Sequence, residues 1–163
     1  MLNLKSKDTA LITVYAALYA ALVVVLGPFS YGPVQIRVAD TMLAAVPLLG
    51  VAGVLGHTLG VFTANLFSTV GVIDLLNTIP SFVMAFVVYY VYRQTRNDYT
   101  VLGTSLAYSV VIGMTVGWML SAVYQLDLLI TIVYVIVGNI IATVLIGWPV
   151  FKVMKRILGK PIW

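Results

Sequence analysis

The sequence contains no cysteine and few charged residues. Without cysteine, the chain has no disulfide, no thiol nucleophile and no cysteine metal ligand. Only 9% of its residues are charged, whereas ordinary soluble domains carry roughly 25%, so the chain lacks the charge to cover a water-facing surface. Hydrophobic residues make up 62% of the 163 residues instead. We therefore expect one integral membrane domain over residues 1–163, with lipid covering much of its surface.

The sequence also lacks the common catalytic and nucleotide-binding motifs. It has one histidine, His57, and no HExxH, GxSxG or Walker-type phosphate loop. His57 has no second histidine or nearby carboxylate, so we expect a structural role for it near the inner turn between the second and third spans. An intramembrane hydrolase needs an activated nucleophile with a base in reach, and no such set is visible. We expect no enzymatic activity, no metal and no cofactor.

Charged residues divide the chain into uncharged runs, whose lengths predict the number of membrane spans. A membrane helix needs about 20 residues, and four of the runs hold one span each. The run 41–73 is longer, because as a single helix it would extend about 50 Å. It is better explained by two short helices joined by a tight turn near Gly50–Gly56. The predicted spans are 9–27, 39–51, 54–70, 75–92, 100–120 and 128–150.

The basic residues predict how these spans are oriented. Apart from Arg37, they lie at positions 5–7, 93–96 and 152–160, outside the apolar runs. Basic residues anchor the cytoplasmic ends of membrane proteins, and no basic face for nucleic acid is visible. Both termini are then cytoplasmic, which requires an even number of spans. We expect an all-α, multi-pass protein of the plasma membrane with six transmembrane helices.

The most elaborate connection, residues 28–38, lies on the outer side between the first two spans. Two prolines and a glycine break the helix there. Val34–Val38 then alternates as a short extended segment, so Gln35 and Arg37 point to the same side. Arg37 alone departs from the positive-inside pattern.

Polar residues gather at or near the outer ends of the predicted spans. A charged group near the membrane core costs at least about 2.5–3.5 kcal/mol, so such groups usually face an aqueous cavity or a partner. Each residue also has an ordinary explanation, such as a solvated carboxylate, an interfacial tryptophan or a bond between helices. Together, donors, carboxylates and aromatics predict a pocket for a small planar polar solute, open to the outside. The candidate residues are Gln35, Arg37, Asp40, Asn65, Asp74, Asn77, Trp118, Tyr134 and Asn139.

Several spans repeat small residues one helical turn apart. Such rows let helix backbones approach closely, and packing within the chain explains most of them. The first span carries two adjacent rows, which form a flat stripe that we expect to dock a helix of a partner protein. The rows are Ala16/Ala20 and Ala17/Ala21 in the first span, Gly56/Gly60/Ala64 in the third, Gly113/Gly117 in the fifth and Gly138/Ala142 in the sixth.

Three sequence elements resemble the QueT family. They are YGPVQIRVAD at 31–40, the G-x-x-x-G-x-x-x-A-N run from Gly56 to Asn65, and Gly71-Val-Ile-Asp74. The resemblance covers about Tyr15 to Asp74, whereas the C-terminal half is similar only in hydropathy and span count. Where the family has Ser-Glu after the arginine segment, this chain has Ala-Asp at 39–40. QueT proteins are substrate-binding S components of energy-coupling factor (ECF) importers and are assigned to queuosine precursors.

The resemblance implies a partner and a ligand. The partner is the shared ECF module, a transmembrane coupling protein with two ATPase subunits, on which the alanine stripe would dock. The ligand would be a 7-deazaguanine such as preQ1, preQ0 or queuine. Its guanine edge offers a donor pair to a carboxylate, and its O6 accepts from an amide or guanidinium. We expect Asp40 and Asp74 to be the acidic pair. Gln35, Arg37 and Asn65 would form hydrogen bonds with the polar groups of the ligand. Its ring would stack on Trp118 or Tyr134.

Three alternatives stay open at this point. The chain could be an S component for another vitamin or purine-like solute, a solitary facilitator or channel, or an intramembrane enzyme. A channel should carry polar residues along its whole path, whereas the inner halves of these spans are nearly all apolar. The enzyme lacks a nucleophile–base set.

Overall fold

The computed structural model describes residues 5–32 and 35–163, and all the regular elements in that part are helices. Some helices follow one another end to end, so the chain forms six lengthwise segments: α1, η1–α3, α4, η2–α5, α6 and α7–η3–α8. The elements η1 and η2 are 3-10 helices, and η3 is a π-helical turn. The bounds are α1 Ser6–Val25, α2 Gly27–Ser30, η1 Val38–Ala45, α3 Val46–Leu49, α4 Val51–Asn65, η2 Val72–Asn77, α5 Thr78–Thr95, α6 Asp98–Tyr124, α7 Leu128–Ile140, η3 Ile141–Ile146 and α8 Gly147–Leu158.

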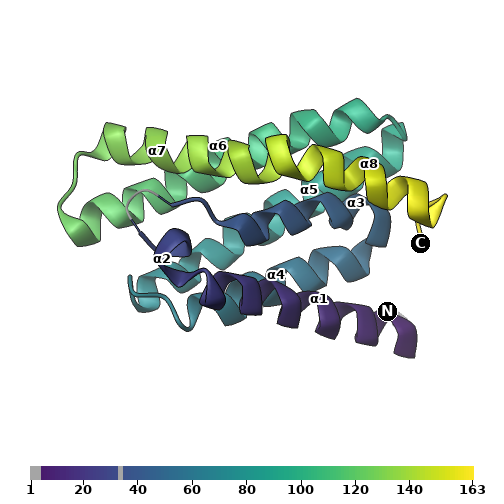
Figure 1. Ribbon diagram of the computed structural model, residues 1–163, viewed down its shortest axis with the longest axis horizontal. Helices are drawn as coiled ribbons and strands as arrows, with labels where there is room; N and C mark the ends of the chain where they lie inside the picture. Colours follow the sequence, from purple (N-terminus) through teal and green to yellow (C-terminus); the bar gives the residue numbers. More distant parts are fainter. Residues whose placement is uncertain (1–4, 33–34) are drawn as a thin grey trace.

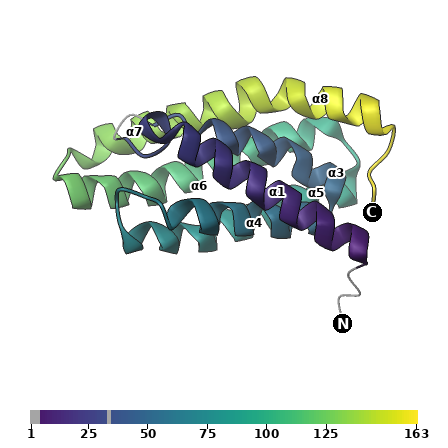
Figure 2. The same ribbon diagram turned by 60° about the horizontal axis from the view of Figure 1, so that its bottom comes forward.

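The segments lie lengthwise beside one another, with the beginning of α1 and the end of α8 at the same end of the bundle (Figure 1). Along the chain, α1 packs against α4, α4 against α5, α5 against α6 and α6 against α7. The short helix η1 contacts α1, α4, η3 and α8, so it is surrounded by other segments. Figure 2 shows α1 crossing the bundle obliquely, with α8 on the far side from α4.

Among the described residues, four helical stretches are long and apolar enough to cross a membrane: Ser6–Val25, Val72–Thr95, Asp98–Tyr124 and Leu128–Leu158. The stretch Val38–Leu49 is apolar but shorter, and α4 has only 15 residues. The predicted all-helical architecture is therefore confirmed. Passage of all six through the membrane, and the side on which the termini lie, stay predictions.

The outward faces of the long helices are apolar, as contact with lipid requires. Large hydrophobic side chains are exposed on α1, α5, α6 and α7, although each of these helices also contributes to the buried core. Examples are Val14, Leu18, Ile79, Val83, Leu106, Val110, Leu129 and Val133.

Gly50 alone makes the turn between α3 and α4. Its φ of 67° lies in the left-handed region that favours glycine. The prediction of two short helices in the run 41–73 is confirmed, but the turn does not extend to Gly56, which lies inside α4. The expected place of His57 at this turn is therefore wrong, because six residues of α4 precede it. The third predicted span was also too long, since α4 ends at Asn65.

Two glycines of α4 bring it close to α1. A Cβ atom on Gly56 would lie 2.8 Å from the Cβ of Tyr15, and one on Gly60 would lie 2.7 Å from the Cβ of Tyr19. A larger residue at either position would therefore push the helices apart. Packing within the chain, the ordinary explanation of the small-residue rows, is confirmed here. The glycine row on α6 brings that helix close to α7 in the same way. Gly113 lies against Ile136 of α7, and Gly117 lies against Ile132.

Candidate functional site

Three charged residues are buried in the part of the bundle near α2. Arg37, Asp40 and Asp74 have exposed fractions of 4%, 1% and 3%. The Nη2 atom of Arg37 lies 3.8 Å from Oδ2 of Asp74, and the charge of Asp40 also acts on Arg37. The local fold places these residues, since the backbone N–H of Asp40 donates to the Arg37 carbonyl at the start of η1. Burial of three charges in a membrane protein is costly and indicates a functional site.

Asp40 is held by tyrosine hydroxyls. Tyr19 of α1 donates to Oδ1 of Asp40 at 2.5 Å, the range of a charge-assisted bond. The hydroxyl of Tyr108 on α6 lies 3.4 Å from the same oxygen. Both tyrosines are fully buried. Asp40 therefore has neutral hydroxyl groups against its oxygen, whereas Asp74 has the guanidinium of Arg37 at 3.8 Å.

His57 lies next to these tyrosines and is fully buried. Its Nδ1 is 3.2 Å from the hydroxyl of Tyr15, and its Nε2 is 3.2 Å from the hydroxyl of Tyr108. The rings of Tyr15, Tyr19 and Tyr108 all meet the imidazole edge to face. The close approach of α1 and α4 at Gly56 and Gly60 makes this arrangement possible.

The segment before η1 packs against α7. Of the predicted extended segment, residues 35–37 are irregular, Val38 already begins the 3-10 helix η1, and Val34 lies outside the described residues. Gln35 and Arg37 are both buried, as expected for side chains on one side. A Cβ atom on Gly138 would overlap the Gln35 carbonyl, so this segment lies directly on α7.

Asn65 joins the end of α4 to η2. Its Nδ2 donates to the backbone carbonyl of Asp74 at 2.8 Å. Nearby, the Tyr31 hydroxyl donates to the carbonyl of Ala64 at 2.7 Å, which fixes the loop after α2 on the same helix end. These two bonds therefore hold Asp74, which lies in the 3-10 helix η2, beside the end of α4 and the loop after α2.

Several buried polar atoms have no hydrogen-bond partner among the described residues. An unsatisfied buried polar group costs about 1–3 kcal/mol and needs an explanation. Asn65 Oδ1 and Asn77 Nδ2 sit on residues that contact or flank Asp74, and Ser81 Oγ follows one turn later on α5. Both donors and acceptors are therefore available to a polar solute beside the buried charges. The unpartnered atoms are Ser30 Oγ, Asn65 Oδ1, Asn77 Nδ2, Thr78 Oγ1, Ser81 Oγ and Asn139 Oδ1.

Seven of the nine predicted site residues are buried, and two are not. The buried ones are Gln35, Arg37, Asp40, Asn65, Asp74, Asn77 and Asn139. Asn139 donates to the Val135 carbonyl of its own helix at 3.1 Å, so its amide oxygen stays available. Trp118 and Tyr134 are exposed by 54% and 51%, and the structure does not bring them to the buried charges. Their predicted stacking role stays untested.

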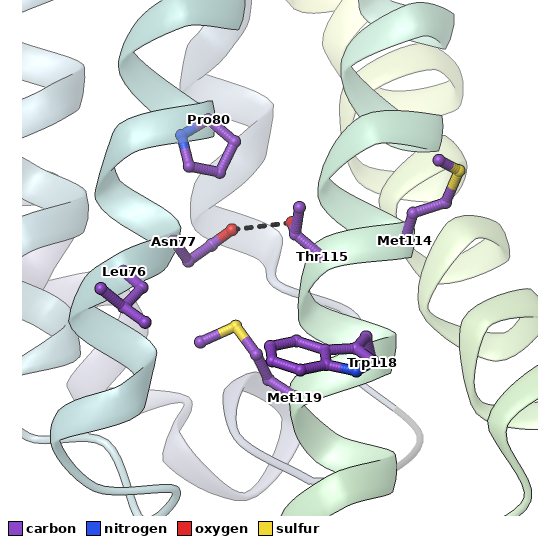
Figure 3. Close-up of a pocket in the computed structure, with 7 residues that line it drawn as sticks. All are labelled: Leu76, Asn77, Pro80, Met114, Thr115, Trp118 and Met119. Atoms are coloured by element: carbon purple, nitrogen blue, oxygen red, sulfur yellow. Dashed lines mark hydrogen bonds between the residues drawn. The ribbon is translucent and has the colours of Figure 1, made fainter.

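Trp118 instead lines a groove of about 320 Å³ between η2–α5 and α6 (Figure 3). Besides Trp118 itself, the groove shares only Asn77 with the predicted site residues. Its lining is mostly apolar, and the Thr115 hydroxyl donates to Oδ1 of Asn77 at 3.1 Å. The groove is therefore suited to an apolar occupant and not to a charged solute. Its lining residues are Leu76, Asn77, Pro80, Met114, Thr115, Trp118 and Met119.

Sequence reasoning missed the aromatic part of the site. Tyr15, Tyr19 and Tyr108 lie in apolar runs, where tyrosine is easily taken for a residue of the membrane interface. One signal was available, because Tyr15 and Tyr19 are four residues apart, as are Gly56 and Gly60. Rows of equal spacing on two helices are typical of a close contact.

The alanine stripe of α1 is only partly exposed. Ala17 and Ala21 are exposed, Ala16 is half-buried and Ala20 is buried. The two rows therefore face different surroundings, since Ala20 packs in the core. Only the row Ala17/Ala21 is open to a partner.

Comparison with known proteins gives one match. The chain matches the family described as QueT transporter over residues 9–156, which is nearly its whole length. No curated protein and no solved structure gives a significant match. The three sequence elements described above lie in the N-terminal half, whereas the family match covers both halves of the bundle. The family description indicates a transport protein. The chain belongs to the QueT transporter family.

Proposed function

We propose that this chain is the S component of an ECF-type importer and that it captures a 7-deazaguanine queuosine precursor from the outer side. Membership of a transporter family supports the transport role. The observation that carries the solute site is the burial of Arg37, Asp40 and Asp74 beside unpartnered amide groups. The cluster is near α2, away from the chain ends in Figure 1, which fits an outer site with cytoplasmic termini.

The guanine edge of the ligand matches the side of the cluster formed by Asp74. A carboxylate accepts from the N1–H and the exocyclic amine of guanine, and a guanidinium donates to O6. Asp74 and Arg37 provide this pair of groups at 3.8 Å from one another. The free amide oxygen of Asn65 adds an acceptor next to Asp74.

The charge count favours a cationic member of the ligand class. Arg37 balances one of the two carboxylates, and its nearest carboxylate is Asp74. Asp40 receives a hydroxyl donor from Tyr19, which brings no positive charge, so the cluster holds one more negative charge than positive charges. A buried charge needs a partner of opposite sign. We infer that Asp40 pairs with the ammonium group of an aminomethyl-deazaguanine, and that the uncharged cyano form binds less tightly.

ATP hydrolysis would take place in the partner module, since the sequence has no phosphate-binding loop. The exposed row Ala17/Ala21 on α1 is the proposed docking strip for the transmembrane coupling protein. Small side chains allow close backbone contact with a partner helix in lipid. The two ATPase subunits would bind to that partner and not to this chain.

Calorimetric titration of the purified full-length protein tests the proposal. The panel holds aminomethyl-deazaguanine, cyano-deazaguanine, queuine, guanine and unrelated vitamins. We expect saturable binding of the deazaguanines and none of the vitamins. Binding of a vitamin, with no response to any deazapurine, would identify an S component for another solute and overturn the proposed ligand.

A further inference from the structure

The hydroxyl of Tyr15 has two neighbours: a backbone carbonyl, which can only accept, and an imidazole nitrogen, which donates or accepts according to its tautomer. It lies 2.6 Å from the backbone carbonyl of Met42 and 3.2 Å from Nδ1 of His57. A carbonyl only accepts, so the single hydroxyl proton of Tyr15 goes to Met42. The Tyr15 oxygen is then free to accept, and Nδ1 of His57 must donate to it.

This direction fixes the tautomer of His57. The side chain is fully buried within the bundle, where a charged imidazolium without a carboxylate in contact would be costly. A neutral imidazole carries one N–H group, and here that group is Nδ1–H. Nε2 is therefore an acceptor, and the hydroxyl of Tyr108 at 3.2 Å is its donor.

Tyr108 consequently has one proton for two acceptors, His57 and Asp40, and the Ser81 hydroxyl also lies beside its oxygen. Nε2 of His57 lies at 3.2 Å and Oδ1 of Asp40 at 3.4 Å from its hydroxyl. While the proton points to His57, Asp40 keeps Tyr19 as its only strong hydroxyl donor. Without the acceptor at His57, the Tyr108 proton would turn to Asp40, which would then receive two hydroxyl donors on one oxygen.

We propose that His57 is a positioning residue that tunes Asp40 for a cationic ligand through Tyr108. By holding the Tyr108 proton, His57 leaves the second lone pair and the negative charge of Asp40 available to an ammonium group. This inference rests on the proposed function only in assigning the ligand cation to Asp40. The tautomer itself follows from the tyrosine contacts and does not depend on any ligand.

Two substitutions separate the donor and acceptor roles of His57. In His57→Asn, the amide nitrogen replaces Nδ1–H as a donor to Tyr15, but no acceptor reaches the hydroxyl of Tyr108. In His57→Gln, the longer amide places an acceptor near the position of Nε2. The substitution Tyr108→Phe removes the contested proton altogether.

Titration of the full-length protein with aminomethyl-deazaguanine and cyano-deazaguanine then gives the test. We expect His57→Asn to weaken binding of the aminomethyl form by about 3- to 10-fold, the worth of one hydrogen bond. Binding of the uncharged cyano form should change less than about 2-fold, within the range of a neutral change. His57→Gln should bind both forms as the wild type does, and adding Tyr108→Phe to His57→Asn should restore binding of the aminomethyl form.

Equal weakening of both ligands by His57→Asn, or no restoration by Tyr108→Phe in a folded protein, would overturn the proposal. A purely structural role of His57 predicts those results, since lost packing is not repaired by a second substitution. Failure of the wild type to bind either ligand would instead overturn the proposed function.

Nitrogen NMR tests the tautomer independently of any ligand. His57 is the single histidine of the chain, so its ring nitrogens are identified without further substitutions when the purification tag contains no histidine. We expect a protonated Nδ1 and an unprotonated Nε2. An Nε2–H tautomer or an imidazolium at neutral pH would overturn the proposal.

Discussion

The guanidinium of Arg37 lies 3.8 Å from the carboxylate of Asp74, and both side chains are almost fully buried. The two residues come from different connections of the bundle, the loop after α2 and the 3-10 turn η2. Their pairing therefore ties together the two segments that cover the same end of the helices. Because neither charge is exposed to water, each depends on the other for compensation.

Substitution of Asp74 by asparagine should weaken both the fold and the binding of ligand. The change leaves Arg37 without its nearest carboxylate, and breaking a buried ion pair costs about 3–5 kcal/mol. We expect a lower melting temperature in detergent and a loss of aminomethyl-deazaguanine affinity of about 2–5 kcal/mol. Asp127→Asn is the control, because Asp127 is exposed and only caps α7 through the backbone N–H of Ile130. Wild-type affinity in Asp74→Asn would place the ligand elsewhere.

Substitution of Asp40 by asparagine should change ligand preference more than overall stability. Asp40 receives a neutral donor from Tyr19, whereas Asp74 pairs with Arg37, so the charge of Asp40 is the one available to a cation. We expect Asp40→Asn to weaken binding of aminomethyl-deazaguanine by about 2–5 kcal/mol. Binding of the cyano form should change by less than about 1 kcal/mol. Equal losses for both ligands in the calorimeter would contradict the assignment of the ligand cation to Asp40.

The parts of the site that could be predicted from the sequence are the charged and amide residues. A charge or amide in a sequence with so few polar residues is conspicuous, and its burial follows from the cost of exposing it to lipid. Arg37, Asp40 and Asp74 were identified for this reason. The second and third helices were predicted from length, because the uncharged run 41–73 is too long for one span.

The tyrosine–histidine network could not be predicted in this way. It depends on contacts between α1, α4 and α6, which are far apart in the sequence, and on which face of each helix is turned inward. The inward and outward faces were also misjudged for Trp118 and Tyr134. Both were expected to face the ligand, and both are about half exposed. Tyrosine and tryptophan are suited to both the core and the membrane interface, so their residue type does not decide between them.

The contact of α4 with α1 should tolerate no side chain at Gly60. A Cβ atom there would lie 2.7 Å from the Cβ of Tyr19, so Gly60→Ala should destabilise the protein by about 1–3 kcal/mol. Gly103→Ala on α6 is a matched control, because a Cβ atom at that position meets nothing within 4 Å. The control should be neutral or slightly stabilising, since alanine favours a helix over glycine by about 1 kcal/mol. Equal melting temperatures for the two variants would contradict the close packing.

Cysteine labelling should establish the orientation, because the chain has no native cysteine. Thr69→Cys and Leu126→Cys are at exposed positions in the connections from α4 to η2 and from α6 to α7. These connections are at the end of the bundle away from the chain ends (Figure 1). Both should react with an impermeant thiol reagent in intact cells. Gln94→Cys and Lys160→Cys are also exposed, but at the opposite end, and should react only after permeabilisation. Labelling of Lys160→Cys in intact cells would place the C-terminus outside.

The exposed row of α1 should be needed for assembly and not for ligand binding. Ala17 and Ala21 are one turn apart and open to a partner, whereas Ala20 is buried in the core. Tryptophan at Ala17 and Ala21 would hold a partner helix away from α1, because close backbone contact requires small side chains. The double variant should lose co-purification with the coupling protein and lose uptake, while calorimetry still shows wild-type ligand affinity.

Two controls make the assembly test specific. Ala107→Trp places the same ring on an exposed position of α6 and should leave co-purification intact, because the docking strip lies on α1. Ala20→Trp should instead lower the melting temperature, since the ring would enter the packed core beside Val23 and Tyr19. Loss of ligand binding together with co-purification in the Ala17/Ala21 variant would mean that the row supports the fold. Normal co-purification and uptake in that variant would show that the partner binds to another face of the bundle.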